Sequence, residues 1–230
     1  MYQLYIANKN YSSWSLRPWV LMTTLGIAFE ERLTPFVPGS NWTPFRHFSP
    51  SGTVPCLHHN GQIIWDSLAI IEYLAEHHVD VWPIDLKART WARCAAAEMH
   101  SGFSALRQEC PMNCAVRVDL NSRSDALERD ILRLDELWQQ GFSQFGGPYL
   151  AGADFSAVDA FFAPVAFRVR SFAIPLSPAS MRYVSLLLNT EAMLQWDAAA
   201  IAEPWVDQAH DDEIAAAGTI VEDRRTATAG

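Results

Sequence analysis

Basic residues are in the minority in this chain of 230 residues, which carries 17 Lys and Arg against 26 Asp and Glu, for a formal net charge of −9. A surface that binds nucleic acid needs a basic face, so this balance argues against nucleic acid as a partner. The sequence has no uncharged apolar run of about 18 residues, the length that a transmembrane helix requires. Its first six residues lack the basic start and apolar length of a signal peptide. We therefore expect a cytoplasmic protein that does not bind a membrane.

Cysteine is scarce, and its four positions are irregularly spaced: Cys56, Cys94, Cys110 and Cys114. This pattern is unlike the disulfide framework of a small secreted domain. Cys110 and Cys114 have Pro111 between them and no histidine nearby at metal-ligand spacing, so we expect no metal site. The pairs His58–His59 and His77–His78 are adjacent in sequence, and adjacent residues of a strand point to opposite faces. We interpret these histidines as surface or packing residues.

Half of the residues are hydrophobic and only 19% are charged, which excludes a disordered chain. The 13 prolines and 11 glycines are close to ordinary usage and exclude collagen-like or low-complexity architectures. A chain of this length can form one large domain or two modest ones, each with a real core.

The first eighty residues alternate between strand and helix patterns. We predict strands over 2–7, 30–36, 53–59 and 62–65, and helices over 16–25 and 68–78. Proline is tolerated in the first turn of a helix, so Pro18 predicts that the first helix begins near Ser15, its N-cap. Asn60-Gly61 is a strong two-residue hairpin signal, and Asp66-Ser67 is a helix N-cap. Pro55 is disfavoured inside a sheet, so we expect an edge position or a special backbone geometry such as a cis bond.

From about residue 86 onward the strand signal disappears. Helical patterns cover 88–108, 124–142, 156–170, 178–188 and 190–202. Ser156 and Asp159 form a capping box at the start of one of these helices. We therefore expect a first domain at 1–80, a linker at 81–86, an all-helical domain at 87–210, and a flexible tail at 211–230, where apolar residues are few.

Four of these motifs together resemble the soluble, cytosolic-type glutathione transferases of bacteria. The first is the serine-rich turn Ser12-Ser-Trp-Ser-Leu-Arg17, which is similar to the serine-type active turn of the zeta and theta branches. The others are Val54-Pro55, which resembles the family's cis-proline, Asp66-Ser67 at a helix start, and the Ser156–Asp159 box. The resemblance covers about residues 1–205. It implies an α+β fold with a thioredoxin-like N-terminal domain, an all-α C-terminal domain, and a homodimer.

The resemblance also implies roles for individual residues. Ser12, with Ser13 next in line, would donate a hydrogen bond to the thiol of glutathione, the co-substrate, and Tyr11 is a lesser candidate. Arg17 would add positive potential beside the thiolate. Val54, Pro55, Asp66 and Ser67 would bind glutathione, with the acidic-Ser helix start holding its γ-glutamyl end. Helix N-termini present free N–H groups and positive dipole ends, which suit carboxylates and a thiolate.

The active turn departs from the zeta pattern at two positions. Trp14 occupies the place of the zeta cysteine, and Leu16 replaces a tryptophan, which makes maleylacetoacetate isomerase activity less expected. The turn contains no cysteine, so dithiol or thiol-transferase chemistry is not expected either. The resemblance therefore favours attack of the glutathione thiolate on a small hydrophobic electrophile, a detoxification reaction. The alternatives are a glutathione-dependent cis–trans isomerase and a non-catalytic glutathione-binding protein.

The electrophile is expected between the domains, against the first helix of the second domain. Candidate residues there are Glu98, Met99, His100, Phe103, Arg107 and Met112. Methionine and phenylalanine at helical spacing occur more often in a core than in a substrate site. Arg107 could hold an acidic substrate or pair with Glu109 or Asp119.

Overall fold

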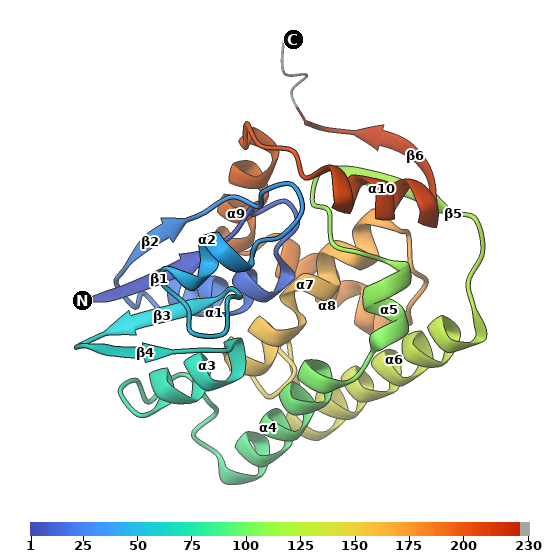
Figure 1. Ribbon diagram of the computed structural model, residues 1–230. Coiled ribbons are helices and arrows are strands. Elements are labelled where there is room, and N and C mark those ends of the chain that lie inside the picture. The colour runs from blue at the N-terminus through green and yellow to red at the C-terminus, as the bar shows by residue number, and fades with distance from the viewer. Residues whose placement is uncertain (226–230) are drawn as a thin grey trace.

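A computed structural model describes residues 1–225 of the chain, and Figure 1 shows a small sheet on one side of the molecule with the helices packed beside it. The first part of the chain contains β1 (Tyr2–Ile6), α1 (Ser13–Thr24), β2 (Phe29–Leu33), α2 (Trp42–Arg46), β3 (Cys56–His59), β4 (Gln62–Ile64) and α3 (Ser67–Ala75). The sheet order is β2-β1-β3-β4, with β1 and β2 parallel and the other neighbours antiparallel. This arrangement is thioredoxin-like, and the α+β fold that the resemblance implied is confirmed.

The sheet follows the alternating pattern of the sequence. In β1 the buried residues Tyr2, Leu4 and Ile6 alternate with the half-buried Gln3 and Tyr5, as expected for a strand with one face on a core. The Val54–Pro55 peptide is cis, so the sequence prediction of special geometry at Pro55 is confirmed. The predicted hairpin at Asn60–Gly61 joins β3 to β4.

Helix α1 begins earlier than its proline predicts. It starts at Ser13 with Ser12 as N-cap, and Pro18 lies inside it, so the predicted start near Ser15 is wrong. Because nine residues of α1 are buried, packing outweighs the backbone cost of an internal proline. Ser15 is fully buried, and its Oγ accepts a hydrogen bond from the Ala7 N–H at 3.3 Å instead of capping the helix.

The second part of the chain is helical, as predicted. It contains α4 (Leu86–Ser101), α5 (Ser104–Glu109), α6 (Asp125–Phe145), α7 (Ala157–Ser171), α8 (Pro178–Leu188) and α9 (Glu191–Ala202). The predicted helix over 88–108 is broken in two, since Phe103 has a positive φ of 53°. The capping box of Ser156 and Asp159 is present at the start of α7, a helix that is buried along nearly its whole length and packs against α1 and α4.

The C-terminal segment is ordered where a flexible tail was expected. Helix α10 (Gln208–Ala217) is followed by β6 (Gly218–Asp223), which pairs antiparallel with β5 (Val116–Leu120), as seen in Figure 1. The expectation of a tail is therefore wrong from 211 to 225, and so is the absence of strands after residue 86. Only Ile214 of α10 is buried, so the apolar pattern gave no signal. Residues 226–230 lie outside the described part of the chain.

We propose 1–80 and 87–210 as the two domains, with 81–86 as the linker. Within residues 1–225, no helix has the length and apolar character needed to cross a membrane.

Candidate functional site

A cavity of about 450 Å³ lies where the two parts of the fold meet. Its first wall comes from the β1–α1 turn and the segment before β3 and includes Tyr11, Ser12, Ser13, Trp14, Thr53 and Val54. Its second wall comes from α5, α7, α10 and the residues after α5 and includes Arg107, Pro111, Met112, Arg168, His210 and Glu213. The predicted glutathione-site residues Ser12, Ser13 and Val54 therefore lie together here, with the lesser candidate Tyr11 and the predicted electrophile-site residues Arg107 and Met112.

The hydroxyl group of Ser12 is hydrogen-bonded to a neighbour in the first domain. Ser12 is nearly buried, and its Oγ donates a hydrogen bond of 2.7 Å to the Oγ of Ser15. The Ser15 Oγ in turn accepts from the Ala7 N–H. The hydroxyl proton of Ser12 is therefore held within the first domain.

Ser13 has the opposite arrangement. Its Oγ accepts a hydrogen bond of 3.3 Å from Nη2 of Arg168, which reaches it from α7 in the helical domain. Among the described residues, no acceptor takes the hydroxyl proton of Ser13, so this proton is available to a group inside the cavity. Ser13 is also the first residue of α1, and its own backbone N–H donates to the Tyr11 carbonyl at 2.9 Å.

Arg168 is held rigidly in this position. The residue is 4% exposed, and its Nη1 donates to the backbone carbonyls of Arg107 and Cys110. Burial lowers the pKa of Arg168 to about 10, and the positive charge of Arg107 acts in the same direction. One side chain thus connects the end of α5 to the serine turn.

Arg17 lies behind the cavity and does not line it. Its guanidinium is buried, stacks over the Trp14 ring at 4.1 Å, and donates to the Ser67 Oγ at 3.4 Å. Burial, together with the positive charges of Arg107 and Arg168, lowers the pKa of Arg17 to about 9. Arg17 therefore links the serine turn to the start of α3.

The start of α3 holds the remaining predicted residues outside the cavity lining. Asp66 is the N-cap, and its Oδ1 accepts from the Leu68 N–H at 2.9 Å. Its Oδ2 lies 3.3 Å from Nε2 of His100, which comes from α4. Ser67 is fully buried, and Pro55, which directly precedes β3, is buried as well. Trp14 and Arg17 lie between this group and the cavity, since Trp14 lines the cavity and Arg17 contacts both Trp14 and Ser67.

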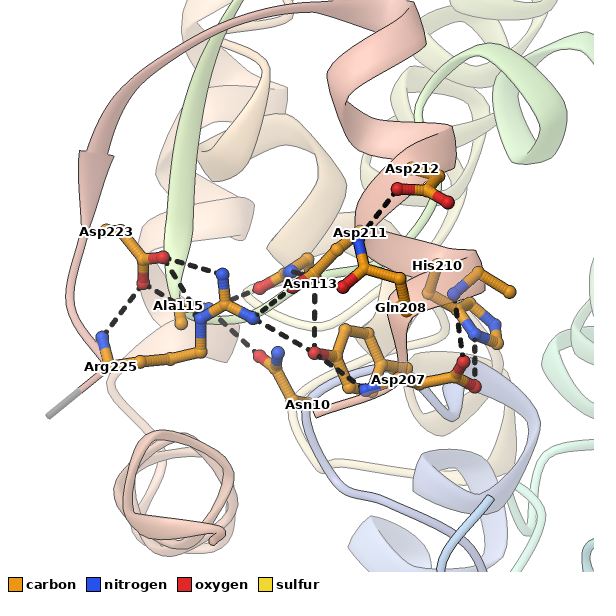
Figure 2. Close-up of polar contacts among 12 residues, drawn as sticks. Asn10, Asn113, Ala115, Asp207, Gln208, His210, Asp211, Asp212, Asp223 and Arg225 are labelled. Carbon is orange, nitrogen blue, oxygen red and sulfur yellow. Dashed lines mark hydrogen bonds and ion pairs between the residues drawn. The ribbon is translucent and has the colours of Figure 1, made fainter. Parts of the chain in front are cut away.

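Tyr11 lines the cavity, but its hydroxyl is occupied by the C-terminal segment. It donates to Asp211 Oδ1 at 3.2 Å and accepts from Arg225 Nη1 at 3.0 Å and from the Asp207 N–H at 3.4 Å. Figure 2 shows Arg225 reaching across to Asp211 and Asp223. Burial raises the pKa of Tyr11, and the nearby Asp211 raises it too. We call α10, β6 and Arg225 the C-terminal strap.

The structure divides the other expected residues between site and core. Met99, Phe103 and Met112 all belong to the core cluster, and of these three only Met112 also lines the cavity. Glu98 pairs with Arg133 at 2.7 Å. Within the described residues, Arg107 forms no ion pair with Glu109 or Asp119, so that sequence alternative is wrong.

Sequence reasoning missed Arg168 and the strap residues His210 and Glu213. Arg168 carried a usable signal, because it is a charged residue near the end of the apolar run that begins at Phe161. The strap carried none, since its contacts to the site, which are polar at Tyr11 and aromatic between His210 and Phe36, join residues that are distant in sequence. No group of three His, Cys, Asp or Glu residues within 1–225 could hold a metal ion.

Comparison with known proteins identifies proteins that are similar in sequence to this chain. Residues 11–77 match the family model "Glutathione S-transferase, N-terminal domain". A probable maleylacetoacetate isomerase of Caenorhabditis elegans is 24% identical over 177 residues, which cover 76% of this chain and 82% of the relative. Glutathione S-transferase 1 of Dianthus caryophyllus is 27% identical over 166 residues, which cover 70% of this chain and 74% of the relative.

Solved structures share the whole fold. A glutathione transferase homolog from Burkholderia GL BGR1, crystallised with glutathione, has a TM-score of 0.65 at 23% identity. The match covers 85% of this chain and 95% of the Burkholderia chain. A theta class glutathione S-transferase from Xanthomonas axonopodis, also crystallised with glutathione, has a TM-score of 0.61 at 21% identity. The match covers 84% of this chain and 95% of the Xanthomonas chain.

Proposed function

We propose that this protein is a glutathione transferase whose Ser13 hydroxyl activates the thiol of glutathione, and the match of residues 11–77 to the N-terminal domain of glutathione S-transferases supports the proposal. The observation that carries the proposal is the Arg168–Ser13 hydrogen bond. Because Arg168 occupies a lone pair of the Ser13 oxygen, the Ser13 proton is directed to another acceptor, and the cavity is where such an acceptor would bind.

The energetic requirement of this role is modest. A free thiol has a pKa of about 8.5, so only a few per cent is ionised at neutral pH. Lowering the pKa by about two units requires roughly 2.7 kcal/mol of preferential interaction with the thiolate. A hydrogen bond to a charged acceptor contributes about 1.5–3 kcal/mol, and the N-terminus of α1 adds to it. The positive charge of Arg168 acts in the same direction.

Glutathione would span from the serine turn to the start of α3. We propose that Val54 and Pro55 hold its cysteinyl part and that Asp66 and Ser67 hold its γ-glutamyl end, with Arg17 fixing Ser67. Support comes from the Arg17–Ser67 contact and from the free N–H groups at the start of α3. Two similar structures were crystallised with glutathione.

In the reaction, the glutathione sulfur forms a bond to an electrophilic carbon of a second substrate in the cavity. Either a leaving group departs with its electron pair, or a neighbouring carbon takes a proton from water. Ser13 donates a hydrogen bond to the sulfur and forms no covalent bond. The apolar lining by Phe36, Phe45 and Met112 suits a hydrophobic electrophile. We also propose that the protein is a cytoplasmic homodimer.

A second candidate is a glutathione-dependent cis–trans isomerase. The maleylacetoacetate isomerase relative at 24% identity favours it, whereas Trp14 in place of the zeta cysteine weighs against it. Direct assay with maleylacetoacetate separates the two, because an isomerase turns it over without consuming glutathione.

The proposal is tested by calorimetric titration with glutathione and by conjugation of 1-chloro-2,4-dinitrobenzene. We expect binding, turnover, and loss of most turnover in Ser13→Ala with binding retained. Glutathione binding with no turnover of any electrophile would instead identify a binding protein, and absence of binding would refute the glutathione assignment.

A further inference from the structure

Three arginines gather around the serine turn, and no described carboxylate lies within ion-pair distance of them, although Asp66 acts on Arg17 and Asp130 acts on Arg107 from farther away. In a chain with a net charge of −9, Arg17, Arg107 and Arg168 form no ion pair with any described acidic residue. Elsewhere in the helical domain Arg133 and Arg170 pair with Glu98 and Asp197. Unpaired positive charges held together repel one another, and a bound anion would relieve this repulsion.

The three arginines differ in what they can offer to a ligand. Arg17 is buried behind Trp14 and does not line the cavity. Arg168 lines it, but both of its Nη atoms already donate to protein groups, and its Nε is buried without a partner. Arg168 therefore supplies a positive charge at a fixed place, but it has no free pair of N–H groups with which to bind a ligand.

Arg107 has a free edge. Its Nη1 donates to the carbonyls of Met99 and His100 at the end of α4, both at 3.2 Å, and this fixes the guanidinium plane. Trp14 supports the guanidinium at 5.5 Å. No described acceptor takes the protons of Nε and Nη2, which form one edge of the planar group. This edge matches the two oxygens of a carboxylate.

We propose that Arg107 binds a carboxylate of the second substrate through its Nε–Nη2 edge, so that the protein acts on electrophiles that combine an apolar body with an acid group. The proposal rests on the glutathione transferase function proposed above. Phe36, Phe45 and Met112 would contact the apolar body. One carboxylate, Glu213, is also among the cavity residues, but it is exposed and forms no ion pair with Arg107.

Arg168 connects the acid site to the reaction centre. Its Nη1 donates to the Arg107 carbonyl at 3.4 Å, and its Nη2 donates to the Ser13 Oγ at 3.3 Å. Arg107 and Ser13 line the same cavity, so a substrate anchored on Arg107 would share the cavity with the thiol activated by Ser13. We expect the electrophilic carbon to lie within a few bonds of the carboxylate.

The test compares one electrophile with and without its charge: trans-3-benzoylacrylate and its methyl ester. In both, the glutathione sulfur bonds to an alkene carbon, the electron pair moves to the adjacent carbonyl as an enolate, and carbon is then protonated by water. The rate without enzyme is subtracted, and each kcat/KM is divided by the rate constant of the same compound with glutathione in buffer, because a carboxylate and its ester differ in intrinsic reactivity. We expect the acid to exceed the ester in kcat/KM by about ten- to a hundredfold, the value of one charge-assisted carboxylate interaction.

Variants of Arg107 test whether this residue causes the preference for the acid over its ester. Arg107→Gln is expected to reduce the acid-to-ester ratio to near one while the KM for glutathione stays within twofold. Arg107→Lys keeps the charge without the planar edge and should retain part of the ratio, which also covers the case that Arg107→Gln does not fold. The control Arg129→Gln removes one charge from an exposed position of α6 and should leave the ratio unchanged.

The outcomes separate this inference from the proposed function. Equal rates for acid and ester in the wild type, or an unchanged ratio in Arg107→Gln, would overturn the acid site while glutathione transferase activity stands. A large rise in the KM for glutathione in Arg107→Gln would also overturn it, because Arg107 would then hold glutathione. No reaction of glutathione with either compound would refute the proposed function itself.

Discussion

The two walls of the cavity are built from different chemistry. The wall from the first domain presents neutral groups, chiefly the hydroxyl of Ser13 and the residues around Val54. The wall from the helical domain presents two guanidinium groups, Arg107 and Arg168, together with Met112 and Pro111. Both walls are needed for one feature, since the Ser13 hydroxyl is oriented by Arg168 of the opposite domain.

This difference indicates that one wall binds glutathione and the other wall selects the second substrate. A neutral wall of hydroxyl and backbone donors suits a constant ligand such as glutathione, whose shape and polar groups do not vary. A wall with fixed positive charge discriminates among second substrates, because charge complementarity contributes to specificity as well as to affinity. The predictions below test this division from the largest expected effect to the smallest.

The largest effect is expected at the serine turn. Ser13→Ala should lower kcat/KM for glutathione conjugation about ten- to a hundredfold, the value of a hydrogen bond to a charged acceptor. Ser12→Ala is the matched control and should lower it less than threefold, since the Ser12 proton is donated to Ser15. Steady-state kinetics on both variants measures this. A larger loss in Ser12→Ala would assign activation to Ser12.

The orienting role of Arg168 predicts the next effect. Arg168→Gln should lower kcat about tenfold with little change in the KM for glutathione, and it should raise the pKa of the bound thiol. Arg170→Gln is a control on the same helix, since Arg170 contacts Asp197 and the Cys114 carbonyl and does not line the cavity. The Arg170→Gln variant should be less stable than the wild type, and the pKa of the bound thiol should be unchanged. If the pKa of the bound thiol changed equally in Arg168→Gln and Arg170→Gln, the role of Arg168 would be structural only.

The fold and the site were predictable to different degrees. The sheet, α3 and the main helices followed from apolar periodicity and caps, because these signals are local. The helix start at Ser13 was not predictable, because burial against α7 outweighs Pro18. The Ser13–Arg168 hydrogen bond joins residues 155 positions apart, and no local pattern encodes it.

The C-terminal strap predicts a smaller effect. Arg225→Ala removes the contacts of Arg225 with Tyr11, Asp211 and Asp223, so β6 should separate from β5 more often. We expect faster amide exchange in residues 218–223 and a KM for the electrophile raised a fewfold, with the KM for glutathione unchanged. Amide exchange that stays at the wild-type rate would show that strand pairing alone holds the strap.

Tyr11→Phe sharpens the assignment of the activating hydroxyl. The Tyr11 hydroxyl is already bonded to Asp211 and Arg225, so this variant should leave the pKa of the bound thiol unchanged. A raised thiol pKa in Tyr11→Phe would assign activation to Tyr11.

The smallest effect concerns pH and stability. Burial raises the pKa of the Glu203 carboxyl to about 7 while it accepts from the Lys9 and Asn10 N–H groups that precede the serine turn. Between its ordinary value of 4.5 and about 7 the folded state binds more protons than the unfolded state, so stability falls as pH rises through this window. Chemical denaturation should show that wild type loses stability relative to Glu203→Gln between pH 5 and pH 8. A difference independent of pH would contradict the raised pKa.

The most direct test of the account is the pKa of the glutathione thiol bound to the protein, followed by thiolate absorbance in an ultraviolet difference titration. We predict a pKa lowered by at least one unit in the wild type and in Ser12→Ala, and a return toward the value of free glutathione in Ser13→Ala and in Arg168→Gln. A bound thiol whose pKa equals that of free glutathione in the wild type would contradict activation by the serine turn.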